Sequence, residues 1–146
     1  MDKDTIKIAN CSGYYGDKLS AAKEMVDGGP IDVLTGDYLA ELTMAILFNQ
    51  KMQRGADKDY VGTFLKQIKE IANTCKKKKI KIVTNAGGLN PSSMAAEIEK
   101  ILIDMGLDLK VAYIDGDDLM PRMEELSECG EMLINLDKNI PLADSG

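Results

Sequence analysis

Short apolar segments alternate with amphipathic segments along the chain, and this alternation predicts strands separated by helices. Four segments are almost continuously apolar and rich in β-branched residues, which is typical of strands buried on both faces of a parallel sheet. They comprise residues 6–9, 31–34, 80–84 and 109–114, and a fifth short strand is predicted at residues 132–136.

The segments between these strands carry apolar residues at every third or fourth position, which is the spacing of a helix with one buried face. Gly106 is expected to end one helix, and Ser92 or Ser93 to cap the start of that helix. Asp117 or Asp118 is expected to cap a further helix. The predicted buried stripes are Leu19, Ala22 and Val26; Leu39, Leu42 and Ile46; Val61, Phe64, Leu65, Ile68, Ile71, Ala72 and Cys75; and Met94, Ala95, Ile98, Ile101, Leu102 and Met105.

This alternation of strands and helices predicts the fold class. The connections are long enough to be crossovers, so neighbouring strands should be parallel. We therefore expect a three-layer, Rossmann-like α/β fold, with a mostly parallel sheet of four to five strands and helices on both faces. The absence of an internal linker or repeat predicts a single domain over residues 1–146.

The composition excludes several kinds of chemistry. The 146 residues carry a net charge of −6, which argues against a nucleic-acid partner because surfaces that bind nucleic acids are basic. The chain contains no histidine, so neither a Ser-His-Asp or Cys-His pair nor a histidine-ligated metal site can form within it. Acid–base chemistry must therefore rest on other titratable side chains or on a cofactor.

The cysteines and the apolar segments bear on location. The three cysteines are widely spaced and form no CxxC motif, which is typical of a reduced compartment. The first residues are charged, and no segment approaches the ~20 apolar residues that a membrane span needs. We therefore expect a cytoplasmic protein with no membrane partner.

Small and polar residues follow each of the four predicted strands. In open parallel sheets, ligands bind outside the carboxyl ends of the strands, and these ends share one edge. We therefore expect one crevice there that takes a small-molecule ligand. The segments are residues 10–17, residues 35–38 with Glu41 one helical turn later, residues 85–91 and residues 115–118.

Each of these residues also has a simpler structural interpretation. The glycines can supply turns, the aspartates can cap helices, the cysteine can be a small buried apolar residue and the tyrosines can cover the rim of the sheet. Only the coincidence of all four strand ends favours a site. The residues concerned are Gly13 and Gly16; Asp37, Asp117 and Asp118; Cys11; and Tyr14 and Tyr15.

The first loop, residues 11–16, is a candidate anion site. It follows a strand and is expected to open a helix, so its amides can face an anion. It lacks the first glycine of GxGxxG and the lysine of GxxxxGK[ST], which leaves a single phosphate, a carboxylate or the pyrophosphate of CoA as ligands. Oxygen ligands for Mg²⁺ are also present; they are Asp37, Asp115, Asp117 and Asp118.

Four motifs at these strand ends resemble those of the acyclic terpene utilisation (AtuA-like) protein family. They are IKIANCSGYYGDKLSAA, IDVLTGDYLAELTMAIL, IKIVTNAGGLNP and VAYIDGDDLMPRM, and the resemblance covers residues 6–137. The first loop has Cys11 where the family often has glycine. Because family members are typically several times longer, the resemblance implies that this chain is the N-terminal part of a longer protein or one subunit of a split protein.

The resemblance implies a role in the catabolism of CoA thioesters or branched carboxylates, with hydratase or lyase chemistry. Such chemistry needs an acid–base pair and a donor to an enolate-like oxyanion. Asp37 is expected to begin a helix, which would place Glu41 on the same face as the second carboxylate; Cys11 and Tyr15 are further candidate acids. The predicted ligand contacts are Ser12, Gly13, Tyr15, Gly16, Asn85, Gly87, Gly88, Asn90, Asp117 and Asp118.

A non-catalytic module that binds a ligand, or completes a site with another chain, is the alternative. The acidic charge, the missing histidine and the incomplete strand pattern favour it. In either case the helix at residues 38–53 is apolar around most of its axis and needs cover on more than one side. We therefore expect a homo-oligomer, or a partner chain carrying the family's C-terminal part, joined through this helix or a sheet edge.

Overall fold

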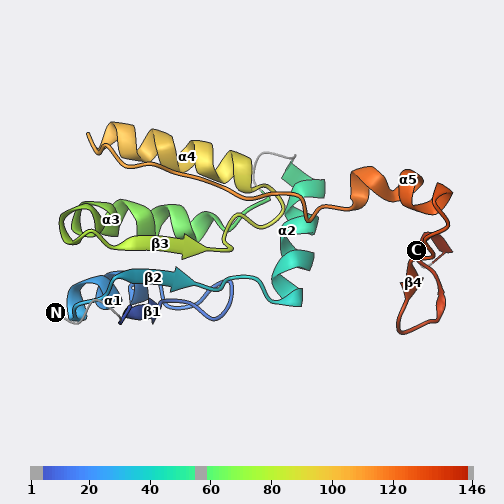
Figure 1. The fold of residues 1–146 in the computed structure, drawn as a ribbon, viewed down its shortest axis with the longest axis horizontal. Helices are drawn as coiled ribbons and strands as arrows, with labels where there is room; N and C mark the ends of the chain where they lie inside the picture. Colours follow the sequence, from blue (N-terminus) through green and yellow to red (C-terminus); the bar gives the residue numbers. More distant parts are fainter. Residues whose placement is uncertain (1–4, 55–58, 145–146) are drawn as a thin grey trace. The chain divides into compact units, whose positions relative to one another are not determined.

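A computed structural model describes residues 5–54 and 59–144 of the chain (Figure 1). Its contacts divide after Ile114 into two units, Met1–Ile114 and Asp115–Gly146. The expectation of one domain over residues 1–146 stays a prediction.

The first unit contains a three-stranded parallel sheet in the order β1-β2-β3. Its strands are β1 (Ile8–Asn10), β2 (Val33–Gly36) and β3 (Lys81–Thr84). Ala9, Leu34 and Ile82 lie side by side in register, and Leu34 is fully buried. The first three predicted strands are therefore confirmed, with bounds shifted by up to two residues.

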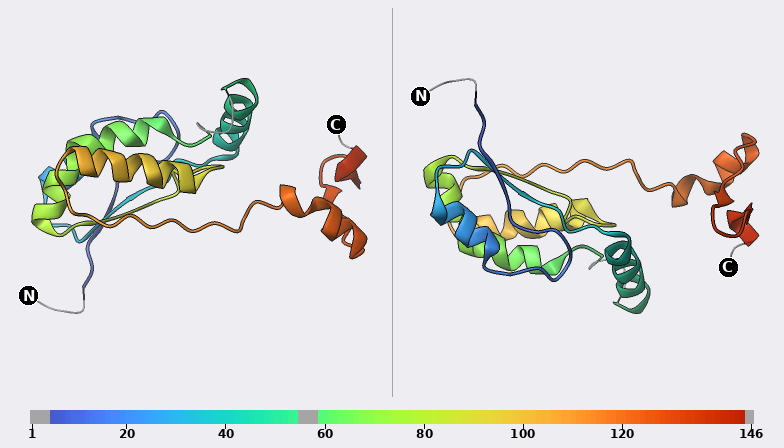
Figure 2. Two further views of the ribbon diagram at one scale, coloured as in Figure 1. Left: turned by 90° about the horizontal axis from the view of Figure 1, so that it is seen from above. Right: turned by 90° about the horizontal axis from the view of Figure 1, so that it is seen from below.

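Four helices accompany this sheet: α1 (Ala21–Gly28), α2 (Glu41–Arg54), α3 (Gly62–Lys78) and α4 (Pro91–Asp104). Figure 2 shows α1, α3 and α4 on one side of the strands. This follows from the strand order, because right-handed crossovers that advance in one direction place every helix on the same face. The prediction of helices on both faces is therefore wrong for the described residues.

The predicted fourth strand is also wrong. Residues 109–114 are extended but pair with no strand among the described residues. Val111 is half-buried against the core, and residues 111–113 lie along α4. The described sheet thus has three parallel strands, and the three-layer Rossmann-like sheet of four to five strands does not form.

The second unit consists of a short helical segment and a hairpin. The 3₁₀ turn η1 (Met120–Arg122) leads into α5 (Met123–Glu128), and β4 (Ile134–Asn135) pairs antiparallel with β5 (Ile140–Pro141) before the 3₁₀ turn η2 (Leu142–Asp144). The strand predicted at residues 132–136 is therefore part of a separate two-stranded sheet.

The predicted stripes of α3 and α4 are confirmed, because their long apolar faces make the main core. The stripe of α2 is wrong in part: Leu42 is 72% exposed, whereas Thr43 and Leu47 are buried. Helix α2 has apolar residues on nearly every side, so the pattern of apolar positions does not show which face is buried. Among the described residues, no helix combines the length and apolar character that crossing a membrane requires.

Candidate functional site

The ends of β2 and β3 are joined by the side chain of Asn85. Its Nδ2 donates to Oδ1 of Asp37 at 2.7 Å, and its Oδ1 accepts from the backbone N–H of Tyr38 at 2.8 Å. The backbone N–H of Asp37 donates to the carbonyl oxygen of Ser12 at 3.1 Å. Three strand ends therefore meet at one exposed carboxylate–carboxamide pair, which we call the Asp37–Asn85 pair.

A buried polar chain lies behind this pair. The hydroxyl of Tyr38 donates to Oε1 of Gln67 on α3 and lies 3.8 Å from the thiol of Cys11. Its ring reaches this position because Gly36 has no side chain: a methyl group there would lie 2.6 Å from the ring. Burial raises the pKa of both Tyr38 and Cys11, so both side chains stay protonated at neutral pH, and the role of Cys11 as an acid stays a prediction.

The loop at residues 11–16 uses much of its own hydrogen-bonding capacity. The buried Ser12 donates its hydroxyl to the carbonyl of Tyr14, and the amide of Gly13 donates to the carboxylate of Asp17 at 2.9 Å. This bond, followed by one from the Lys18 amide, lowers the pKa of Asp17. Asp17 thus places a negative charge where an anion was predicted to bind.

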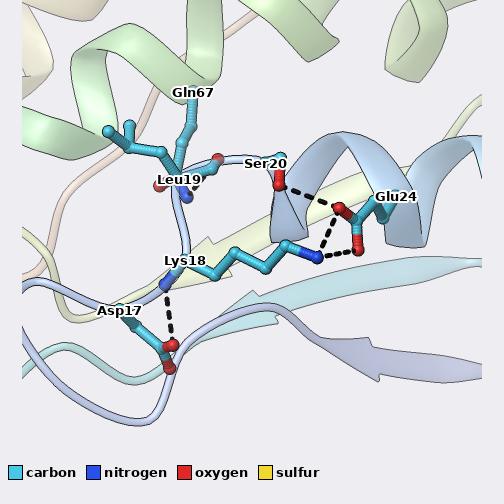
Figure 3. Close-up of polar contacts among 6 residues, drawn as sticks. All are labelled: Asp17, Lys18, Leu19, Ser20, Glu24 and Gln67. Carbon is cyan, nitrogen blue, oxygen red and sulfur yellow. Dashed lines mark hydrogen bonds and ion pairs between the residues drawn. The ribbon is translucent and has the colours of Figure 1, made fainter.

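The same loop does not open a helix directly, contrary to the prediction. Helix α1 starts only at Ala21, and the turn before it is tied down by polar contacts (Figure 3). Lys18 pairs with Glu24, Ser20 donates to Glu24, and Gln67 donates to the carbonyl of Leu19. Gly16 has a φ of 101°, and Tyr15 is half-buried against the core, so both have structural roles in this loop.

The turn after β3 is built around Gly87 and Gly88. A methyl group at Gly87 would lie 2.9 Å from Cα of Pro91, and Gly88 has a φ of 55°. The amide of Gly88 donates to the carbonyl of Asn85, which removes it as an oxyanion donor. Asn90, rather than Ser92 or Ser93, caps α4 by accepting from the amide of Ser93.

The predicted pairing of Asp37 with Glu41 on one helical face is wrong. Helix α2 begins at Glu41, and Asp37 lies before it in the loop. Both residues are exposed, but among the residues that the structure describes no interaction joins their carboxylates.

Asp117 and Asp118 belong to the second unit, so the fourth predicted strand end does not join the other three within one unit. Both are exposed, and Asp118 accepts from the amide of Met120 at 2.9 Å. This bond closes a local turn before η1, but the N-cap residues of η1 and α5 are Leu119 and Arg122 and neither helix has a side-chain cap, so the prediction that Asp117 or Asp118 caps a helix is wrong. Within residues 5–54 and 59–144, no three carboxylates or thiols gather as a metal-binding group.

The motifs that carry these contacts also decide the family. The sequence model of the acyclic terpene utilisation family protein AtuA matches residues 6–146. The chain belongs to this family. No curated protein and no solved structure matches it. In this AtuA family chain, the Asp37–Asn85 pair joins two of the motifs on which the resemblance was based, DYLAELT and VTNAGGLNP.

One carboxylate that the sequence did not indicate as functional is buried next to the turn after β3. Asp59 is 1% exposed, and neither of its carboxylate oxygens has a hydrogen bond among the described residues. Nζ of Lys51 on α2 lies 3.5 Å from its Oδ2. The backbone carbonyl of Asp59 accepts from the amide of Leu89, so the ion pair between Lys51 and Asp59 connects α2 to the turn after β3. No apolar pattern or motif around Asp59 indicates its burial.

Proposed function

We propose that this chain is a component of an enzyme of acyclic terpene or branched carboxylate catabolism that acts on a CoA thioester or carboxylate, with hydratase or lyase chemistry. The observation that supports the proposal most is the Asp37–Asn85 pair, an exposed carboxylate in contact with an exposed carboxamide where β2 and β3 end. Ligands of parallel α/β sheets bind at such strand ends.

The pair has the groups that such chemistry requires. An asparagine amide has two donor hydrogens, and Asn85 uses one of them for Asp37. The other can donate to a carbonyl oxygen that gains negative charge when a proton leaves the neighbouring carbon. Asp37 is the group that takes this proton, because its Oδ2 makes no hydrogen bond with a described residue.

A binding module that completes a site with another chain is the second candidate. The Asp37–Asn85 pair is exposed, and it lines neither the groove in the second unit nor the groove between α4 and residues 111–113. An enzyme site normally encloses most of its ligand. This observation favours a site whose remaining walls come from another chain.

Thermal unfolding with a panel of CoA, branched acyl-CoA thioesters, free branched carboxylates and Mg²⁺ tests the proposal. A ligand at 100 times its Kd stabilises the folded state by ~2.7 kcal/mol, which raises the Tm by several degrees. We expect a thioester or carboxylate to give this shift, and the variants Asp37→Asn and Asn85→Ala to lose it. Asp108→Asn, at an exposed position on the loop after α4, is the matched control.

The two candidates differ in turnover. If the enzyme proposal is correct, Asp37→Asn will abolish conversion of the stabilising ligand by the complete system, and Glu41→Gln will reduce it. Asn85→Ala will weaken binding of this ligand. A ligand shift without turnover in the wild-type system supports the binding module. An unchanged shift in the Asn85→Ala variant contradicts both, because the ligand then binds elsewhere.

A further inference from the structure

The hydroxyl of Thr84, the last residue of β3, lies between the two strand ends that carry the Asp37–Asn85 pair. It donates to the carbonyl of Gly36 at 2.8 Å and accepts from the backbone N–H of Ala86 at 3.1 Å. The first bond holds the peptide group that joins Gly36 to Asp37, and the second holds the peptide group that joins Asn85 to Ala86. One hydroxyl therefore fixes a peptide group next to each member of the pair.

The hydrogen-bonded ladder of the sheet does not extend as far as the pair. Gly36 and Thr84 form the last row in the register of β2 and β3, so Asp37 and Asn85 each lie one residue beyond it. Beyond the ladder, hydrogen bonds of side chains must set how these two residues face each other. A threonine suits this task because its branched Cβ restricts χ1, which limits the directions of its hydroxyl.

The turn after β3 is also held from the side of α3. The carbonyl of Ala86 accepts from the amide of Val61 at 2.9 Å, and both residues are fully buried. The two backbone groups of Ala86 are therefore both hydrogen-bonded, one to α3 and the other to Thr84. Through the hydroxyl of Thr84, this fixed point of the turn is connected to the end of β2.

Thr35 on β2 provides a comparison, because its hydroxyl has the same chemistry between β1 and β2. It lies 3.2 Å from two acceptors, the carbonyl of Ala9 and the side-chain oxygen of Asn10. Neither acceptor belongs to a peptide group next to the Asp37–Asn85 pair. Loss of this hydroxyl should therefore weaken the sheet without changing the contact between Asp37 and Asn85.

From these contacts we propose that Thr84 is the positioning residue of the Asp37–Asn85 pair. Its hydroxyl holds the two peptide groups at the spacing at which the amide of Asn85 reaches the carboxylate of Asp37. The consequence for catalysis rests on the proposed function, in which both groups act on one ligand, and there a displacement of about 1 Å can lower a rate by about 100-fold. The geometric part needs no ligand and is tested separately.

A double-mutant cycle in the full chain tests the geometric part. Thr84→Val removes the hydroxyl and keeps a β-branched side chain, whereas Thr84→Ser keeps the hydroxyl. We expect the loss in urea midpoint caused by Asn85→Ala to shrink by roughly half or more in the Thr84→Val background. It should stay whole in the Thr84→Ser and Thr35→Val backgrounds. Full additivity of Thr84→Val with Asn85→Ala overturns the proposal.

The NMR signals of the Asn85 side-chain amide give a second measurement, in chains that carry no substitution at the pair. Thr84→Val should move these signals towards the chemical shifts of a solvent-exposed amide, because the hydrogen bond to Asp37 is weakened. Thr84→Ser and Thr35→Val should leave them in place. Unchanged Asn85 signals in the Thr84→Val chain overturn the proposal.

The consequence for catalysis is measured in the complete system, with the branched acyl-CoA thioester or branched carboxylate that stabilises the wild-type chain. We expect Thr84→Val to lower kcat/KM roughly tenfold or more, Thr84→Ser to restore most of it, and Thr35→Val to leave it unchanged. Equal kcat/KM values for the Thr84→Val and Thr35→Val chains overturn the positioning role.

The failure of this proposal can be told apart from the failure of the proposed function. If the wild-type chain neither binds nor converts any thioester or carboxylate of the panel, the proposed function is wrong, and the cycle and the NMR signals still decide whether Thr84 positions the pair. If the ligand is converted but the cycle is additive, the role of Thr84 is wrong and the proposed function stands.

Discussion

Asn85 at the end of β3 donates from its side-chain amide to the carboxylate of Asp37 at the end of β2, at 2.7 Å. The same side chain accepts from the backbone of Tyr38, so it closes the edge of the sheet with two hydrogen bonds that span 47 and 48 positions in the sequence. One side chain thus fixes the two groups that the proposed chemistry requires.

This relationship predicts an effect on stability that is separate from ligand binding. Asn85→Ala removes both hydrogen bonds, and each contributes about 0.5–1.5 kcal/mol, so we expect a loss of roughly 1–3 kcal/mol in the free energy of unfolding. Asp37→Asn should cost less, because its amide oxygen can still accept. Urea denaturation measures both. Equal losses for the two variants would contradict the assignment of Asn85 as donor to Asp37 and acceptor from Tyr38.

The sequence predicted those elements whose apolar residues have one consistent period. β2, β3, α3 and α4 belong to this class, since their buried faces are unambiguous. Residues 109–114 have the same apolar character as a strand, but strand formation also requires a hydrogen-bonding partner, which pattern alone does not supply. Leu42 was misplaced because α2 has apolar residues on nearly every side.

The sequence likewise predicted one part of the candidate site, the meeting of strand ends, but not its buried contacts. The convergence of strand ends follows from parallel topology, which brought Asp37 and Asn85 together as expected. The contact of Tyr38 with Gln67 joins residues 29 positions apart through the core, and no local pattern encodes it. The burial of Asp59 likewise depends on how α2 packs against the turn after β3.

Gly88 should be the least replaceable glycine of that turn. A methyl group there would lie 2.9 Å from the carbonyl oxygen of Asp59 and overlap the side chain of Leu47, in addition to the strain of a φ of 55°. Gly106 is the matched control, because its φ is 66° but nothing lies within 4 Å of an added methyl group. Gly106→Ala should cost ~1 kcal/mol.

We expect Gly88→Ala to cost about 2 kcal/mol more than Gly106→Ala, since only Gly88 adds a steric overlap within a packed core. Thermal or urea unfolding of the two variants measures the difference. If the two losses are equal, the turn after β3 can move away from Asp59, and its close packing is not required for stability.

The ion pair between Lys51 and Asp59 should be far more important than the other ion pairs of the chain. Lys51→Met leaves the carboxylate of Asp59 buried with neither a hydrogen bond from a described residue nor a counter-charge. Removing one partner of a buried pair costs about 3–5 kcal/mol, and we expect the lower part of this range because the side chain of Lys51 is 39% exposed.

A double-mutant cycle separates the pair from its parts. The double variant Lys51→Met with Asp59→Asn should be more stable than Lys51→Met alone, because no charge then remains buried. Lys100→Met is the control: Lys100 pairs with Glu97 on the surface of α4, and an exposed pair contributes at most about 1 kcal/mol. A Lys51→Met variant as stable as the Lys100→Met variant would contradict the burial of the pair.

The buried thiol of Cys75 should make the free energy of unfolding depend on pH in the alkaline range. Burial raises the pKa of the Cys75 thiol to about 11, against an ordinary value of 9.0. The unfolded chain therefore loses the Cys75 proton at a lower pH than the folded chain, so the free energy of unfolding falls as the pH rises from about 9 to 11. Two pKa units correspond to at most about 3 kcal/mol.

Urea denaturation of the wild-type chain and of Cys75→Ala at pH 8 and pH 10.5 measures this contribution. The substitution also removes packing, but that loss is the same at both pH values and cancels in the comparison. Other groups that titrate in this range are present in both chains. We therefore expect the wild-type chain to lose more stability between the two pH values than the variant does. Equal losses would mean that the Cys75 thiolate forms as readily in the folded chain as in the unfolded one, and that the core around α3 is open to water.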